Sequence, residues 1–189
     1  IMSKLETNQV DPSTGTTLTL GTSGDTIAIP SGVTIANSGT ATGFGGTNTP
    51  AFEAYLASDQ TVTSGTTTKI TMNTETFDSA GAYDNSSNYR FTPQTAGKYY
   101  VYATVRGSTS NSGLEIQMAA IYKNGSTYIE NQTDFRNNNA SLMGATVVAI
   151  VDMNGSSDYL ECYGRCLGGT TIKATPTRSS IFGAYKIIT

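Results

Sequence analysis

The sequence predicts an all-β protein whose main domain is a two-sheet sandwich. Charged residues make up only 13% of the 189 residues, and there are 20 glycines. Helix surfaces are usually filled by Glu, Lys and Arg, so this composition favours strands and turns. From Thr47 onward, turn signals recur about every 8–12 residues, which is typical of a sandwich or barrel. Eleven tyrosines and six phenylalanines supply large side chains for a core.

Sequence texture divides the chain into three parts. Residues 1–15 are polar and are predicted to form a flexible tail or a docking peptide. Residues 16–46 hold short β repeats and end in the glycine-rich ATGFGG, which is typical of a hinge. Residues 47–189 carry longer segments with aromatic residues and are predicted to form the sandwich.

The repeats of residues 16–46 place apolar side chains at alternate positions in three short clusters. Alternation indicates strands, and the TSGD and PSG stretches between the clusters indicate turns. Each strand is too short to be stable alone, because even a two-stranded hairpin is marginal in water. These side chains therefore need a partner outside their own segment. The six residues are Leu18, Leu20, Ile27, Ile29, Val33 and Ile35.

Ten strands and no convincing helix are expected after Thr47. The strongest strand signal is GKYYVYATVRG, and the Asn124-Gly125 pair is a strong signal for a hairpin turn. Ten strands in roughly 140 residues favour a jelly roll or a related two-sheet sandwich. The ten segments are 51–57, 68–73, 89–92, 97–107, 114–125, 126–131, 141–154, 158–166, 170–175 and 179–189.

Composition and charge exclude several classes of partner. The net charge of −3 comes from 14 acidic and 11 basic residues without runs, whereas nucleic-acid binding needs a basic face. No apolar run is long enough to cross a bilayer, so no membrane insertion is expected. The beginning, IMSKLETNQV, lacks the apolar core of a secretion signal, so synthesis and retention in a cytoplasm are expected.

The two cysteines, Cys162 and Cys166, lie in the stretch YLECYGRC. Four residues apart on an extended strand, their Cα atoms would be about 13 Å apart, beyond the roughly 7 Å limit for a disulfide. A turn at Gly164 would bring them together, so a bridge stays open as the less favoured alternative to two partly buried thiols. A zinc site is not expected, because the chain has no histidine and no second pair of cysteines.

Residues 77–103 read FDSAGAYDNSSNYRFTPQTAGKYYVYA. This pattern resembles the signature of the C1q and tumour-necrosis-factor-like superfamily, with Val101 where the family commonly has Phe. The IYKNG hairpin at 121–125 and the ending SSIFGAYKII agree with the resemblance, which covers about residues 50–189. The matching positions are Phe77, Tyr83, Asp84, Phe91, Gly97, Tyr99, Phe182 and Gly183.

The resemblance implies a ten-stranded jelly-roll head that assembles into a tight homotrimer. In the strand 97–107, Tyr99 and Val101 face one side while Tyr100 and Tyr102 face the other, so both sides need cover. In the family the second cover is a neighbouring subunit; alternatively, these two tyrosines lie half-exposed under a loop. The implied core and interface residues are Phe77, Tyr83, Phe91, Gly97, Tyr99, Tyr100, Val101, Tyr102, Phe182, Gly183 and Tyr185.

A trimeric head would also provide partners for the six aliphatic residues of the repeats. Three copies of residues 16–46 would run side by side and bury these side chains in a shared core, as an intertwined trimeric β stalk. The collagen repeat of the family's animal members, with Gly at every third residue, is absent. The short β repeats resemble the stalks of bacteriophage fibres instead, especially those of marine phages, which argues against a complement or cytokine function.

The sequence offers no catalytic motif, and we expect no enzyme. Without histidine, His-based triads and His-metal sites are excluded, and the acidic residues are scattered rather than paired as glycosidases need. No cofactor is expected, although some members of the family bind calcium near the three-fold axis through turn carboxylates. Asp78 and Asp84 are the weak candidates for such a site here.

A polar loop is a candidate for contact with a receptor, because loops on a rigid scaffold often carry recognition. Its planar amides and its aromatic ring suit sugar binding, and an ordinary solvated loop is the alternative. The loop consists of Phe135, Arg136, Asn137, Asn138 and Asn139.

Three function classes remain open. The leading hypothesis is a homotrimeric bacteriophage virion fibre or adhesin subunit, assembled in the host cytoplasm. Its tail would join another virion protein, and its head would bind a glycan or protein of the host surface. The alternative is a purely structural virion component, such as a head decoration, collar or tail protein, whose head only drives trimerisation. A depolymerase fibre ranks third, because the scattered carboxylates speak against it.

Overall fold

A computed structural model describes residues 10, 14–39, 48–175 and 178–188. The chain divides into two units, residues 1–44 and 45–189. Most of the predicted tail and all of the predicted hinge ATGFGG, residues 41–46, lie outside the described residues. Among the described residues there is no helix of the length and apolarity that a membrane span needs.

Residues 14–39 contain two hydrogen-bonded turns and, within this range, no strand. The Asp25 amide donates to the Thr22 carbonyl at 3.0 Å, and the Val33 amide donates to the Pro30 carbonyl at 3.2 Å. All six aliphatic side chains of the predicted stalk core are exposed in this single chain, by 43–62%. Their burial among three copies stays a prediction.

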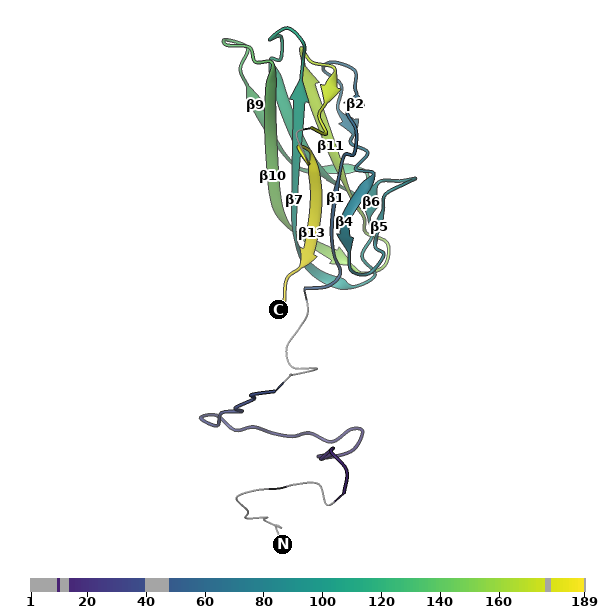
Figure 1. The fold of residues 1–189 in the computed structure, drawn as a ribbon, viewed down its shortest axis with the longest axis vertical. Helices are drawn as coiled ribbons and strands as arrows, with labels where there is room; N and C mark the ends of the chain where they lie inside the picture. Colours follow the sequence, from purple (N-terminus) through teal and green to yellow (C-terminus); the bar gives the residue numbers. More distant parts are fainter. Residues whose placement is uncertain (1–9, 11–13, 40–47, 176–177, 189) are drawn as a thin grey trace. The chain divides into compact units, whose positions relative to one another are not determined.

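The described residues of the second unit, 48–175 and 178–188, fold into two antiparallel sheets, which Figure 1 shows packed on one another. In the described residues, sheet A has seven strands: β1 (Ala51–Tyr55), β2 (Gln60–Thr61), β4 (Thr74–Asp78), β7 (Ala96–Ser108), β10 (Leu142–Asn154), β12 (Thr171–Ile172) and β13 (Ile181–Lys186). The long strand β7 is central, with β10 along one edge and β13 and β12 end to end along the other. From β13 the sheet continues through β1 to β4, and from β12 to β2.

Sheet B has six strands in the part of the chain that is described: β3 (Thr68–Lys69), β5 (Tyr83–Asp84), β6 (Arg90–Phe91), β8 (Ile116–Lys123), β9 (Ser126–Asp134) and β11 (Leu160–Leu167). Strand β11 pairs with β8 on one edge and with β6 and β3 on the other. Strands β8 and β9 form the hairpin predicted at Asn124-Gly125, where φ is 53° and 79°. A two-residue hairpin turn of type I′ requires positive φ at both residues.

The predicted all-β fold class is confirmed: both sheets are antiparallel, and they pack as a jelly-roll-like sandwich. Each of the ten predicted segments overlaps one strand. Strands β2, β4 and β5 were not predicted, because they have only two to five residues and lack alternating apolar positions.

An aromatic cluster fills the end of the core where β1, β6, β7 and β13 meet. The Phe52 ring stacks on Tyr83 and on Phe91, each at 4.5 Å, and meets the edge of Phe182 at 5.1 Å. Tyr99 meets Phe91 edge-on at 5.7 Å. The cluster joins both sheets, so it fixes how the inner faces of the sandwich stack.

The other end of the core holds a buried polar contact between the sheets. Gln117 of β8 is fully buried, and its amide donates to the Val105 carbonyl of β7 at 3.2 Å. The side chain fits because Gly107 leaves space: a Cβ there would lie 1.9 Å from Gln117 Oε1. Cys166, which donates to Gln117 Oε1 at 3.0 Å, and Cys162 are both free thiols, so the alternative of a bridge is wrong. The strand β11 is continuous through Gly164 and keeps them apart.

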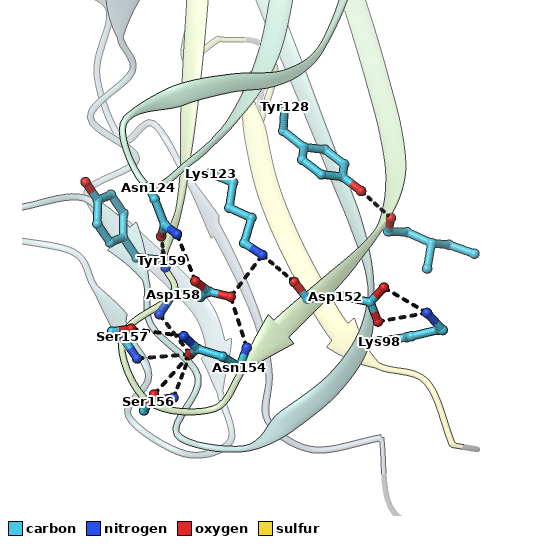
Figure 2. A network of polar contacts seen from close by, with 11 residues as sticks. Lys98, Lys123, Asn124, Tyr128, Asp152, Asn154, Ser156, Ser157, Asp158 and Tyr159 are labelled. Atoms are coloured by element: carbon cyan, nitrogen blue, oxygen red, sulfur yellow. Dashed lines mark hydrogen bonds and ion pairs between the residues drawn. The ribbon is translucent and has the colours of Figure 1, made fainter.

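Side chains from β9 satisfy carbonyl groups along the edge of β10. Tyr128 donates to the Ile150 carbonyl at 3.1 Å (Figure 2). Asn131 donates to the Thr146 carbonyl at 2.8 Å. An open strand edge is a template for unwanted pairing, and these bonds close the sandwich at that side.

Candidate assembly face on the outer surface of sheet A

The outer surface of sheet A carries aromatic and aliphatic side chains, and we name this surface the assembly face. Two rows of paired residues cross it, over the strands β10, β7, β13, β1 and β4 that lie side by side in Figure 1. The rows are Val148–Tyr102–Gly183–Glu53–Phe77 and Ile150–Tyr100–Tyr185–Ala51.

Alternation along β7 separates the assembly face from the core. Tyr99 and Val101 are fully buried between the sheets, whereas Tyr100 and Tyr102 are half-buried on the opposite side. A strand with aromatic residues on both sides leaves one set against solvent in a single subunit.

Tyrosines and aliphatic residues form the centre of the assembly face. The Tyr100 ring lies 5.3 Å from Tyr185 and 6.2 Å from Tyr102. On the neighbouring strand β10, Val148 is 47% exposed and Ile150 is 56% exposed. Exposed apolar side chains gathered on one side of a sheet mark a candidate interaction site.

Tyr102 lies directly on Gly183, its partner across the β7–β13 pair. A Cβ at position 183 would be 2.4 Å from both Cζ and Oη of Tyr102. Glycine at this position therefore allows the ring to pack flat against the backbone of β13. The Tyr102 hydroxyl donates to Glu53 Oε2 at 2.8 Å. Burial is the main cause that raises the pKa of Tyr102 above its ordinary value, and the bond to the Glu53 carboxylate raises it further. The hydroxyl therefore stays protonated and can donate.

Charged and polar groups border the apolar centre. At one end, Lys98 donates to both Asp152 oxygens, at 2.8 and 2.9 Å. At the other end, the guanidinium of Arg178 lies 3.8 Å from Glu53 and 5.1 Å from the ring centroid of Tyr55. An apolar centre with a polar rim is the usual composition of a protein–protein interface.

The structure divides the predicted core and interface residues between two places. Tyr83, Phe91, Tyr99, Val101 and Phe182 lie in the core. Tyr100, Tyr102, Gly183 and Tyr185 lie on the assembly face, where Phe77 is 47% exposed. Gly97 has a φ of 141°, in the region that favours glycine, and a Cβ there would lie 2.8 Å from Lys186 Cε.

Sequence reasoning missed the contribution of β10 and β1 to this face. Val148 and Ile150 lie in the apolar run ATVVAIV, which indicates a buried strand and hides which residues face outward. Glu53 alternates with Phe52 and Ala54, so its outward position could have been predicted, but its contact with Tyr102 could not.

The predicted receptor loop is partly engaged in the fold. Phe135 packs against the core, and its amide donates to the Glu115 carbonyl at 2.8 Å. The Arg136 guanidinium is held by Asp134, through a bond of 3.0 Å from Nε to Oδ1 among others. Asn137, Asn138 and Asn139 are exposed. Of these, Asn137 and Asn138 line a depression together with Asp134, Phe135 and Arg136.

The two weak calcium candidates, Asp78 and Asp84, each accept hydrogen bonds within a turn, and their binding of calcium stays a prediction. Asp78 accepts from the amides of Ala80 and Tyr83, at 3.1 and 2.8 Å. Asp84 accepts from the amides of Ser86, Ser87 and Asn88 and from the Asn88 side chain. In the described ranges, no three His, Cys, Asp or Glu side chains are grouped to hold a metal ion.

The fold is similar to that of solved structures from animals. The globular domain of zebrafish complement 1qA protein aligns with a TM-score of 0.53 and 11% identity, over 73% of this chain and 96% of that one. Eiger TNF from S. frugiperda aligns with a TM-score of 0.55 and 11% identity, over 72% and 91%. Murine APRIL aligns with a TM-score of 0.55 and 8% identity, over 72% and 98%.

At these identities the similarity is one of fold, and the second unit has a C1q/TNF-like jelly-roll fold. No protein-family model matches the sequence, and no curated protein matches it.

Proposed function

We propose that the chain is one subunit of a homotrimeric fibre, in which the assembly faces of three heads pack around a common axis. The observation that carries the proposal is the exposed apolar centre of this face, with Tyr100, Tyr185, Val148 and Ile150 at its middle. Further copies of the same chain are the occupants. The fold is shared with C1q and TNF domains, and the resemblance to that family implies that a neighbouring subunit covers this side of the sheet. Burying apolar surface contributes about 25 cal/mol per Å².

The first unit supports the same assembly. Its six aliphatic side chains are all exposed in a single chain. Two further copies of the same segment would offer identical apolar positions in register, so three chains could form one narrow core. The ordering of three chains offsets much of this gain, so the segment should be structured only in the trimer.

The biological setting that we propose is a bacteriophage virion. The short apolar repeats that precede the jelly roll resemble the stalk of a phage fibre. The collagen repeat of the family's animal members is absent, which favours the same setting. The first 15 residues would attach the fibre to another virion protein, and the heads would bind a glycan or protein of the host surface. Three heads on one stalk would multiply weak contacts by avidity. The mechanism is binding, without bond cleavage or a cofactor.

The mass of the full chain in solution tests the assembly, measured by light scattering at low micromolar concentration. We expect three times the chain mass of 19.8 kDa. A monomer would overturn the fibre, because both apolar surfaces would then stay in water.

Binding of the trimer to host envelopes tests the rest of the proposal. Fluorescently labelled protein should bind intact host cells and be displaced by unlabelled protein. A trimer that binds no host envelope would indicate the purely structural virion component instead. Release of sugar from host polysaccharide would indicate a depolymerase.

A further inference from the structure

The chain contains two Asn-Gly pairs, Asn124-Gly125 and Asn154-Gly155. They are 30 residues apart in sequence. The first lies in the β8–β9 turn, and the second lies at the end of β10, where the loop to β11 begins. Figure 2 shows that both asparagines belong to one network of polar contacts, with Asp158 between them.

Asn-Gly is the dipeptide most exposed to spontaneous deamidation. The glycine amide nitrogen loses its proton and attacks Cγ of the asparagine, and the side-chain nitrogen leaves as ammonia. Water then opens the cyclic succinimide to aspartate or isoaspartate, so water is the only co-reactant. Glycine favours the step because no Cβ hinders the approach, and the rate depends on how often Cγ reaches the nitrogen.

Hydrogen bonds hold the Asn124 side chain away from such an attack. Its Nδ2 donates to Asp158 Oδ1 at 2.8 Å, and its Oδ1 accepts from the Tyr159 amide at 2.9 Å. Both partners lie on the neighbouring loop, so the amide points across to that loop (Figure 2). Bringing Cγ onto the Gly125 nitrogen would break both bonds and the turn.

Asn154 is held by its own loop. Its Oδ1 accepts from the amides of Ser156, Ser157 and Asp158, at 2.9, 3.0 and 3.0 Å. Its Nδ2 donates to Ser157 Oγ at 2.9 Å. Cyclisation would remove the nitrogen that makes the last bond and turn the carbonyl away from three donors.

Asp158 connects the two asparagines. One carboxylate oxygen accepts from the Asn124 side chain, and the other accepts from the Asn154 amide at 3.0 Å. The Lys123 ammonium lies 2.9 Å from the carboxylate and also donates to the Asp152 carbonyl at 2.6 Å. Both asparagines are exposed, so protection must come from fixed geometry and not from exclusion of water.

We propose that Asn124 and Asn154 are latent deamidation sites and that Asp158 guards both of them. While the network is closed, neither Cγ reaches the following nitrogen. A carboxylate formed at position 124 no longer has the Nδ2 group that donated to Asp158. Two negative charges then face each other at this distance and repel. Conversion at Asn124 therefore opens the network and frees the Asn154 side chain to react, so the two sites deamidate together.

Peptide mapping by mass spectrometry tests this on the full chain, incubated near pH 8 and 37 °C. The measured quantities are the gain of one mass unit and the isoaspartate content at each site. We expect both sites of the native protein to react slower than in urea-unfolded protein by about tenfold or more. Asp158→Ala should move both rates toward the unfolded ones, and Asp152→Ala should leave both unchanged. Asp152 is the matched control because its carboxylate pairs with Lys98 outside the guarded loops.

Near-ultraviolet circular dichroism confirms that each variant is folded. If Asp158→Ala does not fold, Asp158→Asn decides, because it keeps the side-chain volume and one acceptor but loses the charge; it should raise both rates by a smaller factor. Equal rates in native and unfolded protein would overturn the proposal. So would a folded Asp158 variant in which either site reacts as in the wild type.

Discussion

At the level of single residues, the contact between Tyr102 and Gly183 sets the shape of the assembly face. Replacing Gly183 by Ala would place a methyl group 2.4 Å from the Tyr102 ring, so the ring must lift off the sheet. We expect Gly183→Ala to lower the free energy of unfolding by roughly 1–3 kcal/mol, the usual cost of overpacking. The shift of the urea midpoint measures it.

Gly144 provides the matched control for this substitution. It lies in β10 of the same sheet, and a Cβ there would meet no atom within 4 Å. Gly144→Ala should therefore leave stability unchanged or raise it slightly. In the double variant Tyr102→Ala/Gly183→Ala, the cost of the second substitution should disappear. Equal costs for Gly183→Ala with and without the ring would contradict the contact.

The two cysteines should be chemically silent in the native protein. Burial raises the pKa of the Cys166 thiol to about 12 and raises that of Cys162 as well, so neither forms thiolate at pH 8. We expect a thiol reagent to label no cysteine in native protein and both in urea. Fast labelling of one thiol in native protein would show that the β11 region opens. Cys162→Ala and Cys166→Ala identify the thiol.

The sequence predicts single residues well where one strand alternates, and poorly where contact depends on several strands. Alternation in residues 97–107 separates Tyr99 from Tyr100 without any structure. The place of Val148 on the assembly face could not be predicted, because its strand reads as apolar on both sides. Phe52 illustrates the same limit, since its role at the centre of the aromatic cluster depends on partners from three other strands.

At the scale of elements, the β5–β6 hairpin depends on Asp84. Amides of Ser87 and Ser86 and the groups of Asn88 donate to its carboxylate and hold its pKa below the ordinary value. A carboxyl with a lowered pKa stabilises the fold above its unfolded pKa of about 3.9. This contribution disappears as the pH falls through the folded value.

The variant Asp84→Asn isolates this contribution, because an amide keeps one acceptor oxygen but no charge. At pH 7 the variant should unfold at lower urea concentration than the wild type. Between about pH 4 and 2, the wild type should lose stability faster, so that the two midpoints converge. Parallel curves over this range would show that the carboxylate contributes nothing to the hairpin.

Elements were predictable where their signals were local. The Asn-Gly turn and the long strands follow from turn chemistry and alternation. Strand β2 has two residues, and it pairs with β12 only because the sandwich brings Gln60 beside Ile172. Such a strand is a product of tertiary packing, and no local pattern encodes it.

At the scale of the whole molecule, a single charge on the assembly face should prevent assembly. Ile150→Glu places a carboxylate among Tyr100, Tyr185 and Val148, where a neighbouring head would remove it from water without a partner. We expect the mass from light scattering to fall from trimer toward monomer. Thr127→Glu adds the same charge to an exposed position of sheet B and should remain trimeric. Dissociation of both variants alike would point to net charge as the cause.

The two units should contribute to one assembly, and a paired substitution in the first unit tests this. Ile27 and Ile29 are exposed in the single chain. They can be buried only if the same segments of several copies align. The variant Ile27→Asp/Ile29→Asp should form trimers through its heads at high concentration. On dilution it should dissociate where the wild type does not, because a joined stalk raises the effective concentration of the heads. Combined with Ile150→Glu, it should give a monomer at every concentration. If the stalk variant dissociates no more readily than the wild type, residues 16–46 do not share a core, and the head alone forms the trimer.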